Sequence, residues 1–189
     1  LGEDTIVLHA AKGFEPESFK RMSEVIAEEL GIDHEDRIGV ISGPSHAEEV
    51  VQGMPTTVVV ASSVERVAKA AQHLLSQATF RVYTNNDVAG LEIAGALKNI
   101  VAIGAGMSDG LGFGDNAKAA LITRGLAEMT RLGIAMGGHA ATFAGLAGMG
   151  DLIATCSSKQ SRNNMVGLQL GQGRAIADIV AEMNMVAEG

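Results

Sequence analysis

The chain has 189 residues, of which 47% are hydrophobic but only 3% aromatic, so a sizeable core is possible and must be aliphatic. The formal net charge of −8 argues against a general nucleic-acid-binding surface, although it leaves room for a local basic pocket. The single cysteine, Cys156, excludes an internal disulfide and fits a reducing cytoplasm.

Strand-like and helix-like patterns alternate over the first 86 residues, which is typical of an α/β layer that is largely parallel at its start. Glu15-Pro16-Glu17 is expected to open the first helix, which Gly31 ends, and Ser62 with Glu65 forms a possible capping box. We predict strands at 5–10, 37–42, 56–61 and 79–84, and helices at 15–30, 46–52 and 64–75.

From Asp87 onwards the pattern is helical, with Asp87 as a plausible cap of a long helix over 88–107. This stretch comes closest to a membrane span but contains Glu92 and Lys98, so no span is expected. Residues 108–114 are predicted to form a glycine loop, and the buried face of the next helix is predicted at Leu121, Ile122, Leu126, Met129 and Leu132. Further helices are expected at 115–136, 139–147, 151–156, 161–170 and 174–183, which places a domain boundary between 1–86 and 87–189.

Lys98 lies within the small, apolar run LEIAGALKN at 91–99. Composition alone favours a lysine whose stem lies along the core while its amine reaches water. The neighbours Gly95 and Ala96, however, leave space for a ligand. A partly desolvated lysine there could exchange a proton with a substrate oxygen or stabilise an alkoxide.

Other polar residues have two interpretations each. Ser161-Arg162-Asn163 opens a predicted helix and forms either an anion site or an ordinary cap with a solvated arginine. Asp151 is either an N-cap or a partner for Lys98 or for substrate hydroxyls. Lys12 and Gly43-Pro44-Ser45 follow predicted strands, where ligands of open α/β sheets gather. Many lysines at such places are merely exposed, and Gly43-Pro44-Ser45 taken alone fits a turn with a helix cap somewhat better than a ligand site.

Several other patterns carry no chemistry. The glycine clusters do not fit G-x-G-x-x-G after a strand, and the five histidines lack metal-ligand spacing, so no metal is predicted. Cys156 has no C-x-x-C companion and is expected to be a small buried residue.

Seven motifs occur together in one order and cover the chain from end to end. They are AKG at 11–13, SGPSHA at 42–47, FRVYTNND at 80–87, GALKN at 95–99, GLGFGDNAKAALITRGLAEMTRLG at 110–133, GLAGMGDLIATC at 145–156 and SRN at 161–163. In these motifs the chain closely resembles the bacterial NAD(P)-dependent glycerol-3-phosphate dehydrogenases.

The resemblance implies the C-terminal part of a Rossmann-type sheet followed by an all-helical catalytic domain. It implies reduction of dihydroxyacetone phosphate to sn-glycerol 3-phosphate for phospholipid synthesis, with NAD or NADP as cofactor and Lys98 as proton donor or acceptor. The implied substrate contacts are Lys12, Gly43, Ser45, Lys98, Asp151, Ser161, Arg162 and Asn163. The implied cofactor contacts are Lys12, Ala47, Arg162, Val186 and Glu188.

The chain differs from this family at its N-terminus, because the first Rossmann strand and its glycine loop are absent from the 189 residues. We therefore expect that the natural protein begins upstream, that this chain alone is inactive or impaired, and that it binds NAD(P) weakly. Uncovered strand edges favour a homo-oligomer, and a cytoplasmic location is expected.

Two alternatives remain open. One is a related dehydrogenase with a Rossmann domain and a helical domain that acts on another hydroxy acid, which the proposed phosphate site disfavours. The other is a non-catalytic helical assembly module, in which Lys98, Asp151, Arg162 and Asn163 would scatter across the fold. Their convergence on one cleft would contradict the second alternative.

Overall fold

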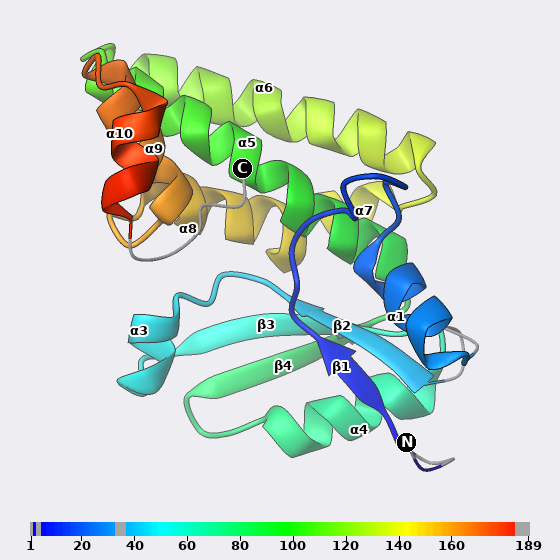
Figure 1. Cartoon of the computed structure of the whole chain (residues 1–189). Helices are drawn as coiled ribbons and strands as arrows, with labels where there is room; N and C mark the ends of the chain where they lie inside the picture. Colours follow the sequence, from blue (N-terminus) through cyan, green and yellow to red (C-terminus); the bar gives the residue numbers. More distant parts are fainter. Residues whose placement is uncertain (1, 3–4, 33–36, 184–189) are drawn as a thin grey trace.

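The computed structural model describes residues 2, 5–32 and 37–183. The first part of the chain forms a mixed sheet with helices, and the second part is helical (Figure 1). The strands are β1 (Val7–His9), β2 (Ile38–Ser42), β3 (Thr56–Ala61) and β4 (Phe80–Asn85), and the helices among them are α1 (Met22–Leu30), α3 (Ala47–Val51) and α4 (Glu65–Leu75). The helical part comprises α5 (Val88–Gly110), α6 (Gly114–Ala135), α7 (Ala140–Phe143), the π-helix η1 (Leu146–Gly150), α8 (Asp151–Ser157), α9 (Arg162–Gly171) and α10 (Ile176–Glu182).

The four strands lie in the order β1-β2-β3-β4. The pairs β1–β2 and β3–β4 are parallel, as predicted, but β2 and β3 are antiparallel. A parallel pair needs a crossover, usually a helix packed on the sheet. The only helix between β2 and β3 is α3, which buries none of its residues, so the chain turns back instead of crossing the sheet.

The sheet lies between two helical layers (Figure 1). Helix α4 packs on one face, and α5 and η1 pack on the other. Strand β3 is buried along most of its length, because apolar residues on both of its faces find partners. This double burial explains why its β-branched run was a clear strand signal.

The first helix starts later than its sequence predicts. The prediction of a start at Glu15-Pro16-Glu17 is wrong, because α1 begins at Met22. The Glu15 carboxylate accepts hydrogen bonds from the backbone N–H of Glu17 and from both the N–H and the hydroxyl of Ser18. These local bonds favour a turn over a helix. Segment 10–20 is therefore a loop between β1 and α1.

The predicted capping box before α4 is also wrong. Ser62 is buried, and its hydroxyl donates to the Ile38 carbonyl oxygen at 2.9 Å while accepting from the Val64 N–H. Helix α4 begins at Glu65, whose carboxylate pairs with Lys69. Ser62 thus ties the end of β3 to β2 instead of capping a helix.

Helix α5 is the axis of the helical part, and the prediction of Asp87 as its cap is confirmed. Asp87 Oδ1 accepts from the Gly90 N–H at 2.8 Å, and Oδ2 accepts from the His139 N–H and the Thr142 hydroxyl. The helix continues to Gly110, so only 111–113 of the predicted glycine loop lie outside helices. Within the described part of the chain only α5 is long and apolar enough to cross a membrane, and 61% of its 18-residue apolar window is buried inside the protein.

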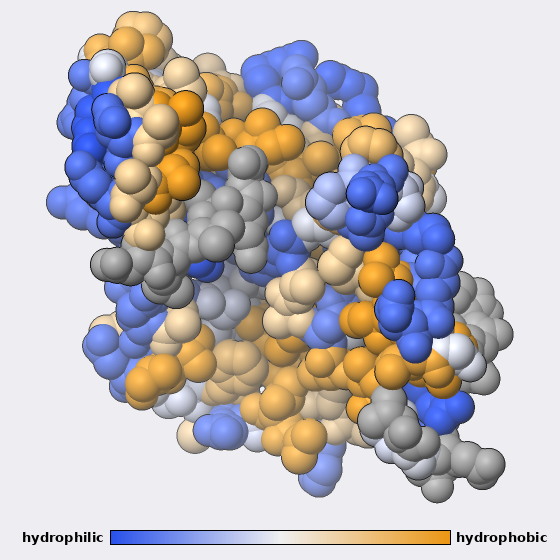
Figure 2. Space-filling model, viewed as in Figure 1, coloured by the Kyte–Doolittle hydropathy of each residue, from blue (hydrophilic) through white to orange (hydrophobic). Residues whose placement is uncertain are grey.

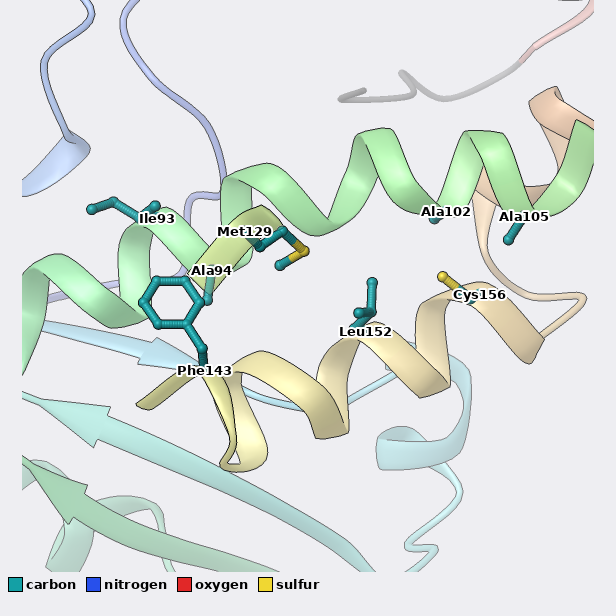
Figure 3. Packing of buried hydrophobic residues seen from close by; sticks show 8 residues of the cluster. All are labelled: Ile93, Ala94, Ala102, Ala105, Met129, Phe143, Leu152 and Cys156. Carbon is teal, nitrogen blue, oxygen red and sulfur yellow. The ribbon is translucent and has the colours of Figure 1, made fainter. Parts of the chain in front are cut away.

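The main hydrophobic core lies between α5 and the helices α6, α7 and α8 (Figure 3). The predicted buried face of α6 is correct at Met129, and at Leu121, Ile122 and Leu126, which pack against this core. It is wrong at Leu132, which is exposed; after Met129 the buried face of the helix continues at Gly133 instead. The buried cluster consists of Ile93, Ala94, Ala102, Ala105, Met129, Phe143, Leu152 and Cys156.

The expected helix over 139–147 is divided into α7 and η1 at a sharp turn. Gly148 makes this turn possible, because a Cβ there would lie 2.1 Å from the Phe143 carbonyl oxygen. The π-helix leads directly into α8, whose first residue is Asp151. Single-turn π-helical segments often occur at functional sites.

Candidate functional site

A pocket of about 260 Å³ lies where the loop after β1 and the loop after β2 meet helices α5, α8 and α9. It collects polar side chains from segments that are far apart in the sequence. The lining residues are Ala10, Lys12, Ser45, His46, Lys98, Asn99, Asp151, Thr155, Gln160, Ser161, Arg162 and Asn163.

Asp151 joins two lysines at the base of this pocket. Its Oδ2 accepts a hydrogen bond from Lys12 Nζ at 2.6 Å, and its Oδ1 lies 3.3 Å from Lys98 Nζ. Lys98 and Asp151 are only 5% and 3% exposed, whereas Lys12 is partly exposed. Asp151 therefore uses its side chain as an ionic partner and not as an N-cap. A buried charge needs such pairing, since desolvation alone would disfavour it strongly.

Thr155 is the second partner of the Lys98 amine, beside Asp151. Lys98 Nζ donates to Thr155 Oγ1 at 2.7 Å, and that oxygen lies 2.6 Å from the Asp151 backbone carbonyl and 3.2 Å from Asp151 Oδ1. The hydroxyl has one proton, which it donates to Asp151 while it accepts from the lysine. The carboxylate of Asp151 and the hydroxyl of Thr155 thus restrict the position of the Lys98 amine.

The Lys98 side chain is almost fully buried and its amine is held by Asp151 and Thr155, which contradicts a lysine that extends freely into solvent. Burial lowers the pKa of its amine below the ordinary value; the charge of Asp151 opposes that effect, and the charge of Lys12 adds to it. A lysine with a lowered pKa releases its proton more readily than an exposed one. The amine can therefore serve as a general acid or, once deprotonated, as a general base.

The second polar group of the pocket is the start of α9. Ser161 caps this helix, because its hydroxyl accepts from the Asn164 N–H at 3.2 Å. The exposed Arg162 lies at the first helical position, beside the buried Asn163. Asn163 Oδ1 is buried and has no hydrogen-bond partner in the described structure. Backbone N–H groups and a guanidinium at one helix start suit an anionic ligand.

The other predicted contacts fall in different places. Ser45 lines the pocket, and its hydroxyl donates to the Gly43 carbonyl oxygen at 3.0 Å. Gly43 is not among the lining residues. It shapes the turn, with a φ of +135° and with Val58 Cα 3.1 Å from the position of a Cβ. Ala47 lines a neighbouring pocket of about 290 Å³ that shares Lys12 and Ser45 with the first. Val186 and Glu188 lie outside the described residues.

Sequence reasoning missed five lining residues. Thr155 follows Asp151 by four residues in a helical segment, so helical spacing could have placed both on one face. Asn99 and Gln160 adjoin residues that were predicted, and Asn99 is buried despite its polarity. No sequence signal identified Ala10 or His46, whose places depend on how the loops after β1 and β2 approach α8.

Two other predictions concern metals and the cysteine. The described residues contain no group of three or more His, Cys, Asp or Glu side chains that could hold a metal ion. Cys156 is fully buried in the core, as predicted. Burial raises the pKa of its thiol to about 11, which keeps it protonated near neutral pH.

Lys98, Asp151, Arg162 and Asn163 line the same pocket. The alternative of a non-catalytic helical module predicted that these residues would scatter across the fold. Their convergence contradicts that alternative, because separate structural roles give no reason for two lysines, a carboxylate and a helix start to meet.

Comparisons with known proteins agree along the whole chain. A family model described as the NAD-dependent glycerol-3-phosphate dehydrogenase N-terminus matches residues 1–68, and the model of the C-terminus matches residues 87–189. Curated proteins named glycerol-3-phosphate dehydrogenase (NAD(P)+) from Oceanobacillus iheyensis and Lysinibacillus sphaericus are 58% and 56% identical over all 189 residues. The chain covers 55% and 56% of their lengths, so it spans about half of these relatives.

Solved structures give the same result. The glycerol-3-phosphate dehydrogenase of Coxiella burnetii has a TM-score of 0.94 and 43% identity; the match covers 100% of this chain and 57% of that one. The structure of DsGPDH of Dunaliella salina has a TM-score of 0.91 and 28% identity, covering 100% of this chain and 37% of that one. On these grounds, the chain belongs to the NAD-dependent glycerol-3-phosphate dehydrogenase family.

Proposed function

We propose that the chain carries the substrate-binding and proton-transferring residues of a glycerol-3-phosphate dehydrogenase. The reaction is the reversible, NADH- or NADPH-dependent reduction of dihydroxyacetone phosphate to sn-glycerol 3-phosphate, a precursor of phospholipids. The observation that carries this proposal is the common pocket of Lys98, Asp151 and Arg162. It offers a proton donor and an anion site within reach of one small molecule.

The carbonyl end of the substrate lies at Lys98 in this proposal. When bound, NAD(P)H supplies a hydride to the carbonyl carbon, and the carbonyl oxygen then needs a proton. Lys98 Nζ gives that proton and takes it back in the reverse direction, and its lowered pKa favours the release. Asp151 and Thr155 hold the amine in place, which supports transfer along one direction.

The phosphate end lies at the start of α9. Arg162 contributes a guanidinium, and Ser161 and Asn163 contribute polar groups beside the first N–H groups of the helix. The partnerless Asn163 Oδ1 is available to a substrate hydroxyl. Binding energy at the phosphate, remote from the reacting carbon, helps to place the carbonyl for transfer.

The neighbouring pocket supports a nicotinamide cofactor. Its walls include the apolar Ala47, Val50 and Val58, and it opens beside Lys12. Ser42, which also lines it, has a buried hydroxyl without a hydrogen-bond partner in the described structure. Mostly apolar walls with a few polar groups, here the hydroxyls of Ser42 and Ser45, suit a flat ring that carries an amide. The other proposed cofactor contacts are Arg162, Val186 and Glu188. We also propose that this chain alone binds NAD(P) weakly.

Three broader features belong to the same proposal. The family matches end at residue 68 and resume at residue 87, which supports domains at 1–86 and 87–189. A cytoplasmic location is consistent with the free thiol of Cys156. Homo-oligomer formation is supported by exposed apolar residues, which Figure 2 shows over the sheet and near α9 and α10.

The test uses the full-length gene product and follows NADH oxidation with dihydroxyacetone phosphate. Lys98→Ala is expected to lower kcat by about 10²- to 10⁴-fold, the usual contribution of a general acid or base. Lys118→Ala is the matched control, because Lys118 pairs with Asp109 outside the pocket. A Lys98→Ala enzyme with near-normal kcat would refute the catalytic assignment.

The phosphate site has a separate test. Arg162→Ala is expected to raise the KM for dihydroxyacetone phosphate by about 10- to 100-fold, because a hydrogen bond to a charged group contributes about 1.5–3 kcal/mol. Unphosphorylated dihydroxyacetone should respond little to the same substitution. An unchanged KM, or equal use of both ketones by the wild type, would favour a different hydroxy-acid dehydrogenase.

A further inference from the structure

Glu92 forms a buried cluster outside the pocket. It lies on α5 and is 4% exposed. Its Oε1 accepts from the Ser23 N–H at 2.8 Å, and its Oε2 accepts from the Ser23 hydroxyl at 2.7 Å and from Arg21 Nη1 at 3.2 Å. His9 Nε2 lies 3.4 Å from Oε1. None of these four residues lines the polar pocket.

The partners of Glu92 stand at the two ends of the loop 10–20. His9 is the last residue of β1, and Arg21 and Ser23 lie at the start of α1. The loop between them carries Lys12, whose amine reaches Asp151. One carboxylate on α5 therefore contacts both ends of the loop that brings a lysine into the pocket, through hydrogen bonds at the α1 end and an approach of 3.4 Å at His9.

The Lys12 stem continues this contact along α5. A Cβ built at Gly95 would lie 3.4 Å from Lys12 Cγ, so the lysine stem passes close to the helix there. Glu92, Gly95 and Lys98 are successive residues three apart on one helix, and such residues are neighbours on its surface. The loop is thus attached at Glu92, passes Gly95 and delivers the Lys12 amine beside Lys98.

Glu92 is suited to be a fixed anchor. Burial opposes its charged form, but the contacts with His9 and Ser23 outweigh burial and lower the pKa of the carboxyl. The group therefore stays ionised and accepts several hydrogen bonds at once. Hydrogen bonds to an ionised acceptor are stronger than neutral ones, and their number restricts where the loop ends can lie.

We propose that Glu92 is a positioning residue for Lys12. By holding both ends of the loop 10–20 against α5, it sets the Lys12 amine at Asp151 and thereby fixes the charges that surround Lys98. Glu92 touches neither substrate nor cofactor. The predicted effect of Glu92 on turnover rests on the proposed function. Its predicted effect on the loop 10–20 does not depend on that function.

The test compares Glu92→Gln with Glu24→Gln in the full-length gene product. Both substitutions remove a carboxylate that contacts Arg21 near the start of α1, but Glu24 has no hydrogen bond to α5. Glu92→Gln is expected to lower kcat/KM by about 10- to 100-fold, the effect of a misplacement of about 1 Å. Glu24→Gln is expected to leave kcat/KM near the wild-type value even where it lowers the melting temperature.

A double-mutant cycle separates positioning from general destabilisation. If Glu92 acts through Lys12, Glu92→Gln should lose most of its effect on kcat/KM in a Lys12→Ala background. Ser23→Ala, which removes only one hydrogen bond of the cluster, is the milder variant if Glu92→Gln fails to fold. It should cause a smaller loss that also disappears in the Lys12→Ala background.

Hydrogen exchange provides a readout without turnover. Glu92→Gln, or Ser23→Ala in its place, should speed amide exchange in residues 10–20, and Glu24→Gln should not. Multiplicative effects in the cycle, or equal exchange in the two glutamate variants, would overturn the positioning role. If the proposed function were wrong, the results would differ in another way. Lys98→Ala would then retain activity, while Glu92→Gln would still speed amide exchange in residues 10–20 relative to Glu24→Gln.

Discussion

The crossing of α5 and α9 depends on glycines, and Gly106→Ala tests it. A Cβ at Gly106 would lie 2.0 Å from the Asn164 carbonyl oxygen and 2.8 Å from the Leu168 nitrogen. The opposing Gly167 is equally close to α5, with the Ile103 carbonyl oxygen 2.0 Å from its Cβ position. Both close contacts are with backbone atoms, so no side-chain rotation can relieve them.

The magnitude follows from the geometry. Since real Cβ atoms essentially never come closer than 3.0 Å to such atoms, α9 must move by about 1 Å, which corresponds to an overpacking penalty of about 1–3 kcal/mol. Alanine also gains about 1 kcal/mol over glycine in a helix interior. Gly104→Ala isolates that gain, because its Cβ would meet Leu121 Cδ1 at an ordinary 3.5 Å. The two variants should therefore differ by the overpacking penalty alone.

The assay is urea unfolding of both variants beside the wild type. Gly106→Ala is expected to have a free energy of unfolding about 1–3 kcal/mol below that of Gly104→Ala. Its melting temperature should be lower by about 2–4 °C for each kcal/mol. Because α9 begins with Arg162 and Asn163, the same shift should weaken substrate binding. Equal stability of the two alanine variants would refute the reasoning about close backbone packing.

Two further predictions rest on buried titratable groups. Since burial raises the pKa of the Cys156 thiol to about 11, iodoacetamide should alkylate the native protein at pH 8 far more slowly than the urea-unfolded chain; equal rates would contradict this. The pKa of Lys98 is lowered in the folded state, so between that lowered value and its ordinary 10.5 the unfolded chain binds more protons. The free energy of unfolding of the wild type relative to Lys98→Met should therefore rise with pH in this window, and a flat or falling difference in urea titrations would count against the shift.

Elements with strong local signals were predictable from the sequence. Strand β3 is an unbroken β-branched run, and α5 begins at an aspartate cap followed by a long apolar stretch. Both signals agree with the tertiary structure, because β3 is buried on both faces and α5 lies in the core. Local preference and burial therefore favoured the same conformation.

The errors arise where local and tertiary demands differ. Glu15-Pro16-Glu17 has the composition of a helix start, but the Glu15 carboxylate closes a turn onto Ser18 instead. The strand direction of β3 could not be predicted from its own residues. It depends on whether α3 covers the sheet, and α3 remains outside the buried layers.

The environment of Lys98 also lay beyond the sequence pattern. Composition alone favoured a snorkelling lysine, and only its small neighbours Gly95 and Ala96 pointed to a ligand site. What decides the matter is Asp151 and Thr155, which α8 places within 3.3 Å and 2.7 Å of the amine. The predicted polar residues were mostly correct as members of one pocket, but their pairwise contacts follow from helix packing that no single motif encodes.

The charge balance of the pocket resolves an apparent conflict between composition and ligand. The whole chain has a formal charge of −8, whereas the described residues that line the pocket include Lys12, Lys98 and Arg162, with Asp151 as their one carboxylate. An acidic protein therefore presents a local excess of positive charge where three helices and two loops meet. Lysine charges held beside a low-dielectric wall act more strongly than the same charges in water. The proposed substrate, a small phosphorylated ketone, would match this field, with its anionic end attracted to Arg162 and its carbonyl placed at the amine of Lys98.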